Sequence, residues 1–356
     1  MDGAVPQGAG AGGAGPQGPG AGGATTLRPG FVIALLGPTG VGKTGVAVAL
    51  SRRLGVRVIS CDSMQMYRGL PVLTNQPSIR ETGLAPHELV GTLDPDAECT
   101  TIEYAALARP LIDEDMRTGG RALICGGTGL YMRAALAPLE AAPTSEPDAR
   151  RHLEERAARE GASLLHAELA RRDPDAATRI DPRNVRRVVR ALEVAMSPGG
   201  SGWSGRDDLW KPRYFHRTFV FGLTMDRSAL YRRIDRRAAE MLEGGAVEEV
   251  RDHRAQVASA TCAAGRTVGS SEARGVRQAI GYRQICRYLD GLQSWEQTVV
   301  EVAGATRRYA RRQETWLRKV SDAVMIDVQD RAAEEISEEI LSLVGSVSDQ
   351  EERSIP

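Results

Sequence analysis

The chain has 356 residues, of which 42% are hydrophobic and 26% are charged, enough to bury one large core or two modest ones. Its formal net charge is zero, so any contact with nucleic acid must come from local basic patches and not from global attraction. The longest purely aliphatic or aromatic run, Phe31–Leu36, is far too short to cross a membrane, and we expect no membrane partner.

The chain begins with a segment of low complexity, residues 1–30, which is almost entirely Gly, Ala, Pro and Gln. We expect a disordered leader there, because such a composition cannot form a core. The five cysteines are scattered without a CxxC pair, and the five histidines show no ligand spacing. We therefore expect no disulfide bonds, no zinc site and a reducing, cytoplasmic environment.

The first predicted strand, Phe31–Leu36, is followed directly by a complete GxxxxGK[ST] motif and a predicted helix, Lys43–Leu54. This order places backbone N–H groups around a chain of phosphates. Lys43 would reach the terminal phosphates, and Thr44 would offer its hydroxyl to an accompanying Mg²⁺. The motif predicts a bound polyphosphate or diphosphate, held by Gly37, Pro38, Thr39, Gly40, Val41, Gly42, Lys43 and Thr44.

Further strands alternate with helices along the chain, which predicts an α/β fold with a mostly parallel sheet, a P-loop NTPase-like core. We assign this core to residues 31–136 and 213–344. The predicted strands after the first are Val56–Ser60, Ala122–Cys125, Thr218–Leu223 and Ala323–Val328, and the predicted helices are Ile102–Met116, Ser228–Val250 and Glu296–Lys319.

Residues 137–212 differ from the core, because they contain charged, Ala- and Arg-rich helical stretches without a convincing strand. Pro147–Leu169 and Pro182–Ala195 are the predicted helical stretches of this helical insertion domain. We expect Ser259–Gly275, which is small and polar, to be a mobile loop, and residues 345–356 to be a flexible tail.

Polar residues follow the second and third strands at the edge where ligands of such sheets bind. Asp62 comes directly after Val56–Ser60, and Thr128 follows Ala122–Cys125. The carboxylate of Asp62 could accept a proton, support a metal ion or cap a helix. Without other evidence, a threonine in a glycine turn, such as Thr128, is more often a structural residue than a catalytic one.

Basic residues recur on predicted helices. Arg233 and Arg237 are four residues apart and share one face, which suits an anionic leaving group but also an ordinary solvated face. Residues 181–190 and 307–319 are two basic patches, the second with interleaved aromatic residues. Such patches suit RNA phosphates and splayed-out bases, although charged helix faces are an alternative explanation.

Taken together, these motifs resemble the tRNA dimethylallyltransferases of bacterial type, also called tRNA isopentenyltransferases. The resemblance runs from about Phe31 to Val328 and rests on the P-loop, DSMQMYRG at 62–69, GGTGLY at 126–131, RVVRALE at 187–193, the 233–244 helix, GYRQ at 281–284 and RRQETWLR at 311–318. One departure is Gln76, where many bacterial members carry a lysine.

The resemblance implies transfer of a dimethylallyl group from dimethylallyl diphosphate to N6 of the adenosine 3′-adjacent to the anticodon, in tRNAs reading codons that begin with U. The P-loop would hold the diphosphate with Mg²⁺ near Thr44, Asp62 would orient N6 and accept its proton beside Thr128, and Arg237 with Arg233 would bind the diphosphate. We expect a monomer whose tRNA contacts are Asp62, Ser63, Met64, Gln65, Arg186, Arg187, Arg190, Arg277, Tyr282, Arg283, Arg311, Arg312, Gln313, Trp316 and Arg318.

Two other functions use a similar P-loop and aspartate. An adenylate isopentenyltransferase would prenylate free AMP, ADP or ATP and needs no grip on an anticodon stem. A small-molecule kinase could use Asp62 as a base but would need an adenine pocket and a nucleotide lid.

Overall fold

The computed structural model describes residues 30–139, 148–200, 211–263 and 275–353. Residues 1–29 of the expected leader and 264–274 of the loop expected at Ser259–Gly275 lie outside the described part. The loop prediction is wrong for residues 259–263, which continue the preceding helix, because alanine and the other residues there include no glycine or proline to end it. Of the helices in the described ranges, none is both long and apolar enough to span a bilayer.

The described residues contain a six-stranded sheet in the order β3-β2-β4-β1-β5-β6, in which every pair is parallel. All five predicted strands are present within two residues of the expected bounds, so the predicted α/β core is confirmed. The short edge strand β3 was not predicted, because two residues carry no pattern. The strands are β1 (Phe31–Leu36), β2 (Val58–Ser60), β3 (His87–Glu88), β4 (Arg121–Gly126), β5 (Thr218–Thr224) and β6 (Ala323–Asp327).

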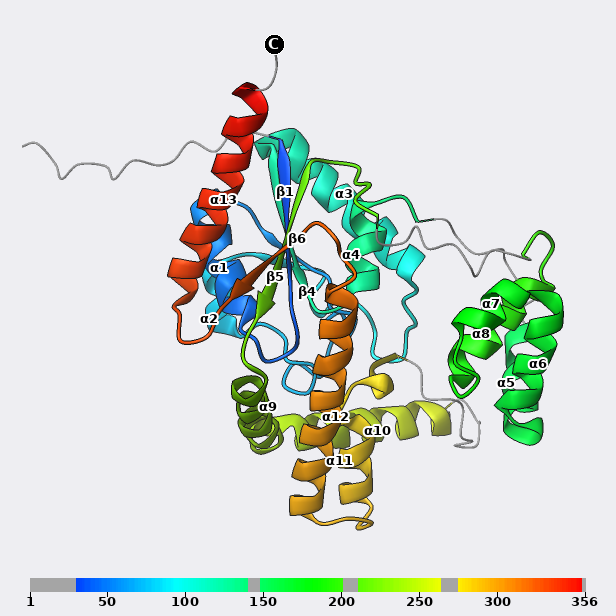
Figure 1. Ribbon diagram of the computed structural model, residues 1–356. Coiled ribbons are helices and arrows are strands. Elements are labelled where there is room, and N and C mark those ends of the chain that lie inside the picture. The colour runs from blue at the N-terminus through cyan, green and yellow to red at the C-terminus, as the bar shows by residue number, and fades with distance from the viewer. Residues whose placement is uncertain (1–29, 140–147, 201–210, 264–274, 354–356) are drawn as a thin grey trace, which may run out of the picture.

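Strand β1 lies at the centre of the sheet, and all six of its side chains are buried. Alternate residues serve opposite faces, as the two-residue period of a strand requires. Phe31, Ile33 and Leu35 pack with α1 (Lys43–Leu54) and α13 (Ala333–Arg353). The other three residues pack with α3 (Thr101–Gly119) and α4 (Gly129–Leu136), so helices cover both faces (Figure 1). The short α2 (Ile79–Leu84) follows β2.

Four helices cover the carboxyl ends of the strands (Figure 1). They are α9 (Arg227–Met241), α10 (Val247–Ala263), α11 (Tyr282–Leu289) and α12 (Trp295–Leu317), with short helical turns at Leu242–Ala246 and Gly275–Gln278. They form a third hydrophobic cluster with Tyr67, Leu70 and Leu73 from the loop after β2.

The prediction of one continuous helix over Ser228–Val250 is wrong. A π-helical turn, Leu242–Ala246, separates α9 from α10, and within it Gly245 has φ of +116°. Residues with side chains rarely adopt this conformation, so glycine permits the change of direction. The flexible tail predicted at 345–356 also differs from the structure, because α13 continues to Arg353. The segment has no proline before its last residue, so nothing in it stops the helix.

The helical insertion has a hydrophobic core of its own, which contains Leu153, Leu165, Leu169 and Leu192. Its helices are α5 (Ala149–Glu160), α6 (Ala162–Arg172), α7 (Pro174–Arg179) and α8 (Val185–Met196), and they stand apart from the sheet (Figure 1). The helical stretch predicted over Pro147–Leu169 contains two helices, because Gly161, with φ of +89°, interrupts it.

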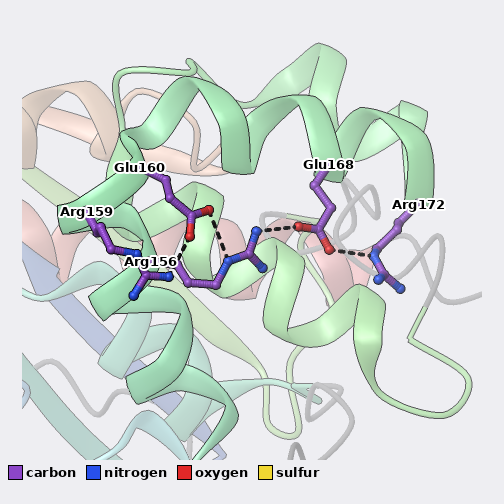
Figure 2. Close-up of polar contacts among 5 residues, drawn as sticks. All are labelled: Arg156, Arg159, Glu160, Glu168 and Arg172. Atoms are coloured by element: carbon purple, nitrogen blue, oxygen red, sulfur yellow. Dashed lines mark hydrogen bonds and ion pairs between the residues drawn. The ribbon is translucent and has the colours of Figure 1, made fainter.

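Ion pairs join α5 to α6 (Figure 2). Glu168 accepts hydrogen bonds from Arg156 and Arg172, each at 3.0 Å, and Arg156 also donates to Glu160 at 3.3 Å. Burial acts to raise the pKa of Glu168, but the two arginines outweigh it and hold the pKa below the usual 4.5. A carboxyl with a lowered pKa stabilises the fold above its unfolded-state pKa and loses this contribution as the pH falls.

We expect Glu168→Gln to make opening of α5–α8 easier by about 1–2 kcal/mol at pH 7, because charge-assisted hydrogen bonds are lost. This difference should shrink as the pH falls through the lowered pKa of Glu168, below which the carboxyl is protonated in both states. Hydrogen exchange of α5–α8 peptides in the full chain measures it. The control is Glu155→Gln, which removes an exposed carboxylate 4.0 Å from Arg151 and should change opening by less than about 0.5 kcal/mol. Equal effects of the two variants at pH 7 would contradict the assignment.

Candidate functional site

The P-loop connects β1 to the N-terminus of α1. Gly40 and Gly42 have φ of +86° and +105°, so the turn requires residues that tolerate the left-handed region. The Nζ of Lys43 donates hydrogen bonds to the carbonyls of Gly37 at 3.1 Å and Pro38 at 3.0 Å. The loop after β1 and the N-terminus of α1 thus have the arrangement of strand, glycine turn and helix that the motif predicted, while the binding of an anion there stays a prediction.

Lys43 shares its surroundings with two other predicted site residues. Desolvation lowers its pKa, the carboxylate of Asp62 and the thiol of Cys125 oppose this effect, and the guanidinium of Arg237 adds to it. Charge interactions weaken with distance, so Asp62 and Arg237 belong to the electrostatic surroundings of the ammonium group. Three residues that the sequence analysis selected, Lys43, Asp62 and Arg237, therefore share one environment.

Asp62 and Thr128 lie in adjacent turns, because they follow the neighbouring strands β2 and β4. Oδ1 of Asp62 accepts a hydrogen bond from the Met64 amide at 3.0 Å, which fixes the carboxylate. The Thr128 hydroxyl accepts from the Ser63 amide at 3.2 Å, and the Thr128 amide donates to the Cys61 carbonyl at 3.2 Å. The two turns are therefore joined by hydrogen bonds, and both predicted residues are held beside the P-loop.

The two predicted arginines of α9 lie at the same edge of the sheet. Arg233 is half-buried, and its guanidinium is 3.6 Å from the position that a Cβ on Gly42 would occupy. Arg237 is exposed and acts electrostatically on Lys43. Arg236 instead pairs with Glu240 at 3.6 Å on the solvent side. The i, i+4 spacing thus places Arg233 and Arg237 toward the P-loop.

Helix α12 contributes a stripe of three residues that contact these turns. Tyr309 lies near Thr128 and Asp62, and burial, with a further contribution from Asp62, raises the pKa of its hydroxyl, whereas Thr128 acts to lower it. Gln313 accepts a hydrogen bond from the Thr39 amide at 2.8 Å and donates one to the Gly127 carbonyl at 2.8 Å. Trp316 packs against the turn at Gly129.

Gln313 and Tyr309 depart from the sequence analysis. Gln313 was predicted to contact tRNA, but it is only 1% exposed and both ends of its amide bond to backbone groups inside the protein. Tyr309 was not selected as a site residue. The sequence does contain a signal for Tyr309. Residues 309, 313 and 316 are uncharged and fall on one face of a helix, whereas the residues around them include several arginines.

The predicted RNA-contacting residues divide by accessibility. Tyr282 is 6% exposed and is bonded through its hydroxyl to Nδ1 of His253 at 2.7 Å, so it lies in the core and not on a surface. Arg190 pairs with Glu193 at 2.9 Å, and Arg277 pairs with Asp96 at 3.1 Å. The exposed residues of the set are Arg186, Arg187, Arg283, Arg311, Arg312 and Arg318.

Two polar side chains near Asp62 are turned toward the protein. Gln65, predicted as an RNA contact, donates to the Asn75 carbonyl at 2.7 Å and accepts from the Ser60 hydroxyl at 3.2 Å. Gln76 donates to the Tyr67 carbonyl at 2.6 Å. Gln76 therefore holds the loop that follows β2, which a lysine at this position would not do through the same amide.

We expect Gly129→Ala to destabilise the protein by about 1–3 kcal/mol through overpacking, although alanine is normally the better helix former. A Cβ at Gly129 would lie 2.4 Å from ring atoms of Trp316. Denaturant unfolding of the full chain measures the effect. Gly119→Ala, at the end of α3 with nothing within 4 Å of the added carbon, is the matched control and should be neutral or stabilising. Equal stability of the two variants would mean that α12 does not pack on this turn.

Two family models match the chain. The IPP transferase family matches residues 65–320, and the isopentenyl transferase family matches residues 31–83. The tRNA dimethylallyltransferase of Symbiobacterium thermophilum is 37% identical over 312 residues, which cover 86% of this chain and 93% of the relative. The tRNA dimethylallyltransferase of Bacillus subtilis is 35% identical over 300 residues, which cover 83% and 90%.

Solved structures agree with these matches. The tRNA isopentenylpyrophosphate transferase of Bacillus halodurans is 33% identical with a TM-score of 0.63, covering 90% of this chain and 99% of that one. A eukaryotic dimethylallyltransferase acting on tRNA is 26% identical with a TM-score of 0.68, covering 85% and 74%. The predicted resemblance is confirmed, and the chain belongs to the tRNA dimethylallyltransferase family.

Proposed function

We propose that this protein transfers the dimethylallyl group of dimethylallyl diphosphate to N6 of the adenosine 3′-adjacent to the anticodon, in tRNAs reading codons that begin with U. The observation that carries the proposal is the meeting of an anion cradle with a fixed carboxylate, since Asp62 lies close enough to Lys43 to influence its pKa. The first feature suits a diphosphate, and the second suits the proton of an amino group.

Each group has a role in the transfer. The bond between the prenyl carbon and the diphosphate oxygen breaks, the bond between that carbon and N6 forms, and Asp62 takes the proton that N6 loses. Negative charge develops on the diphosphate as it leaves, and Lys43, Arg233, Arg237 and the amides of the P-loop stabilise it. The hydroxyls of Thr128 and Tyr309 lie beside the carboxylate, where they can hold the adenine.

Thr44 is the residue that would hold Mg²⁺, as part of this proposal. The described residues contain no group of three or more His, Cys, Asp or Glu side chains arranged to hold a metal. A single hydroxyl fits a magnesium ion that takes its remaining ligands from the diphosphate and water. When bound, the ion would neutralise part of the charge on the diphosphate.

The RNA surface that we propose consists of the exposed arginines, chiefly Arg311 and Arg312 on α12 and Arg318 at its C-terminal cap. Gln313, which bonds to Thr39 of the P-loop and to Gly127, lies on the same helix. The target adenine must leave the anticodon stack to reach Asp62, which costs a few kcal/mol. Helix α8 of the insertion adds Arg186 and Arg187 for the anticodon stem. We propose a monomeric enzyme that works in the cytoplasm, where its RNA substrate is found.

Incubation with labelled dimethylallyl diphosphate and either unmodified tRNA or AMP tests the proposal. We expect label in tRNA and none in AMP, and no ATP turnover. Label in AMP would indicate an adenylate isopentenyltransferase, and phosphoryl transfer from ATP without prenylation would indicate a kinase.

We expect Asp62→Asn to reduce the rate of transfer about 10²–10⁴-fold, because an amide cannot accept the proton. The amide oxygen can still accept the Met64 hydrogen bond, so the turn is kept. Single-turnover rates and binding of tRNA, which should change little, measure the effect. Asp113→Asn, which removes an exposed carboxylate bonded to His216 at 2.7 Å, is the control. An unchanged rate in the Asp62 variant would remove its assigned role.

We expect Arg311→Ala with Arg312→Ala to weaken tRNA binding and to reduce the slope of log K against log salt by about 1.5, for two lost phosphate contacts. Affinities from 50 to 300 mM salt, on the order of the physiological range, measure the slope. The control is Arg52→Ala with Arg53→Ala, which removes the same charge from the last turn of α1. Equal slopes in the two double variants would contradict an RNA surface on α12.

A further inference from the structure

Gln313 lies between the part of the site that holds the diphosphate and the part that faces the adenine. Its Oε1 accepts from the Thr39 amide, within the P-loop after β1. Its Nε2 donates to the carbonyl of Gly127, the residue before Thr128 and after β4. Strands β1 and β4 are neighbours, so one side chain of α12 joins the turns at their two carboxyl ends.

The chemistry of the side chain suits this position. A primary amide carries one acceptor and donors at the end of a flexible stem, so it can satisfy one backbone N–H and one backbone carbonyl at once. Both backbone groups lie in turns, where they have no ladder partner, and leaving either without a partner in the interior is unfavourable. Gly127 is necessary for the close approach, because a Cβ there would lie 2.1 Å from Nε2 of Gln313.

We propose that Gln313 is a positioning residue that sets the P-loop against the Gly127–Thr128 turn, and so aligns the prenyl carbon with the attacking nitrogen. This inference rests on the proposed function. A residue that aligns two bound substrates supports the rate of reaction more than the binding of either one. Gln313 touches neither substrate in this assignment, because it is buried beneath both turns.

Because of the neighbours of Gln313, its positioning role can be tested without unfolding the protein. Tyr309 lies near Thr128 on one side, and Trp316 packs at Gly129 on the other. Loss of the Gln313 amide therefore leaves α12 docked by two further side chains. The expected defect is a change in the relative placement of two turns and not the release of the helix.

The experiment compares Gln313→Met, which keeps the length of the side chain but makes neither hydrogen bond, with Thr298→Val. Thr298 is a fully buried polar residue of the same helix, bonded to Gln293 at 2.7 Å and to the Ser294 carbonyl at 2.8 Å. It lies fifteen positions earlier, about 22 Å along the helix axis. Comparison of the two variants therefore distinguishes the effect of losing any buried hydrogen bond on α12 from the effect of losing the hydrogen bonds of Gln313.

Single-turnover transfer to tRNA at saturating dimethylallyl diphosphate should fall about 10- to 100-fold in Gln313→Met and stay close to wild type in Thr298→Val. Dissociation constants for tRNA and for the unreactive dimethylallyl thiodiphosphate should change less than about threefold in both variants. A rate loss shared equally by the two variants, or one removed by raising substrate concentrations, would overturn the proposal.

Hydrogen exchange gives a readout that does not depend on prenyl transfer. The Thr39 amide should exchange faster in Gln313→Met than in wild type, and unchanged exchange of the P-loop peptide would overturn the proposal. If the wild-type protein failed to prenylate RNA, the proposed function would fall, while faster P-loop exchange would still establish that Gln313 fixes the loop.

Discussion

The burial of β1 on both faces and along both edges is the constraint on which the site depends. Its six apolar residues pair with β4 on one side and β5 on the other, so the chain must leave the sheet at Leu36 in a fixed direction. The parallel register then carries the ends of β2 and β4 to the same level. Turns at that level expose backbone groups that no strand can satisfy, and α12 supplies the missing partners for two of them.

Charge in this molecule is organised locally. The whole chain is formally neutral, yet Lys43, Arg233 and Arg237 gather at the P-loop edge, where the carboxylates of Asp62, Glu81 and Glu240 also act on them. Such a gathering of cations favours an anionic ligand. Other acidic residues that balance the count lie elsewhere, for example in the ion pairs of the insertion (Figure 2). The zero net charge of the chain therefore does not reveal that cations gather at this edge of the sheet.

Sequence patterns specify most of the core because the relevant signals are local. The buried run Phe31–Leu36 and the motif that follows it predict a strand, a turn and a helix that the structure places within a residue or two. The break at Gly245 escaped prediction because the apolar pattern continues through it, although the pair Gly244-Gly245 is a local signal for a turn. The edge strand β3 escaped because two residues have no periodicity.

The basic segment at 307–319 shows a different limit. Its composition indicates a surface, but three of its residues form an inward stripe and Gln313 is buried. The composition of a segment does not distinguish the two faces of a helix, although the inward and outward faces have different roles. Which face is inward depends on Thr39 and Gly127, which are far away in the sequence. Burial of Tyr282 against His253 is a non-local fact of the same kind.

The connection through Gln313 contains no ionisable group. A histidine or a carboxylate in its place would change its bonding with acidity, and an ion pair would weaken as electrolyte accumulates, but a buried neutral amide responds to neither. Alignment of the two turns is therefore insulated from the cell's ionic conditions, while the arginines on the outer face of the same helix remain sensitive to them. In the proposed function, one helix would thus hold the RNA through salt-sensitive arginines and align the two turns through an amide that does not respond to salt.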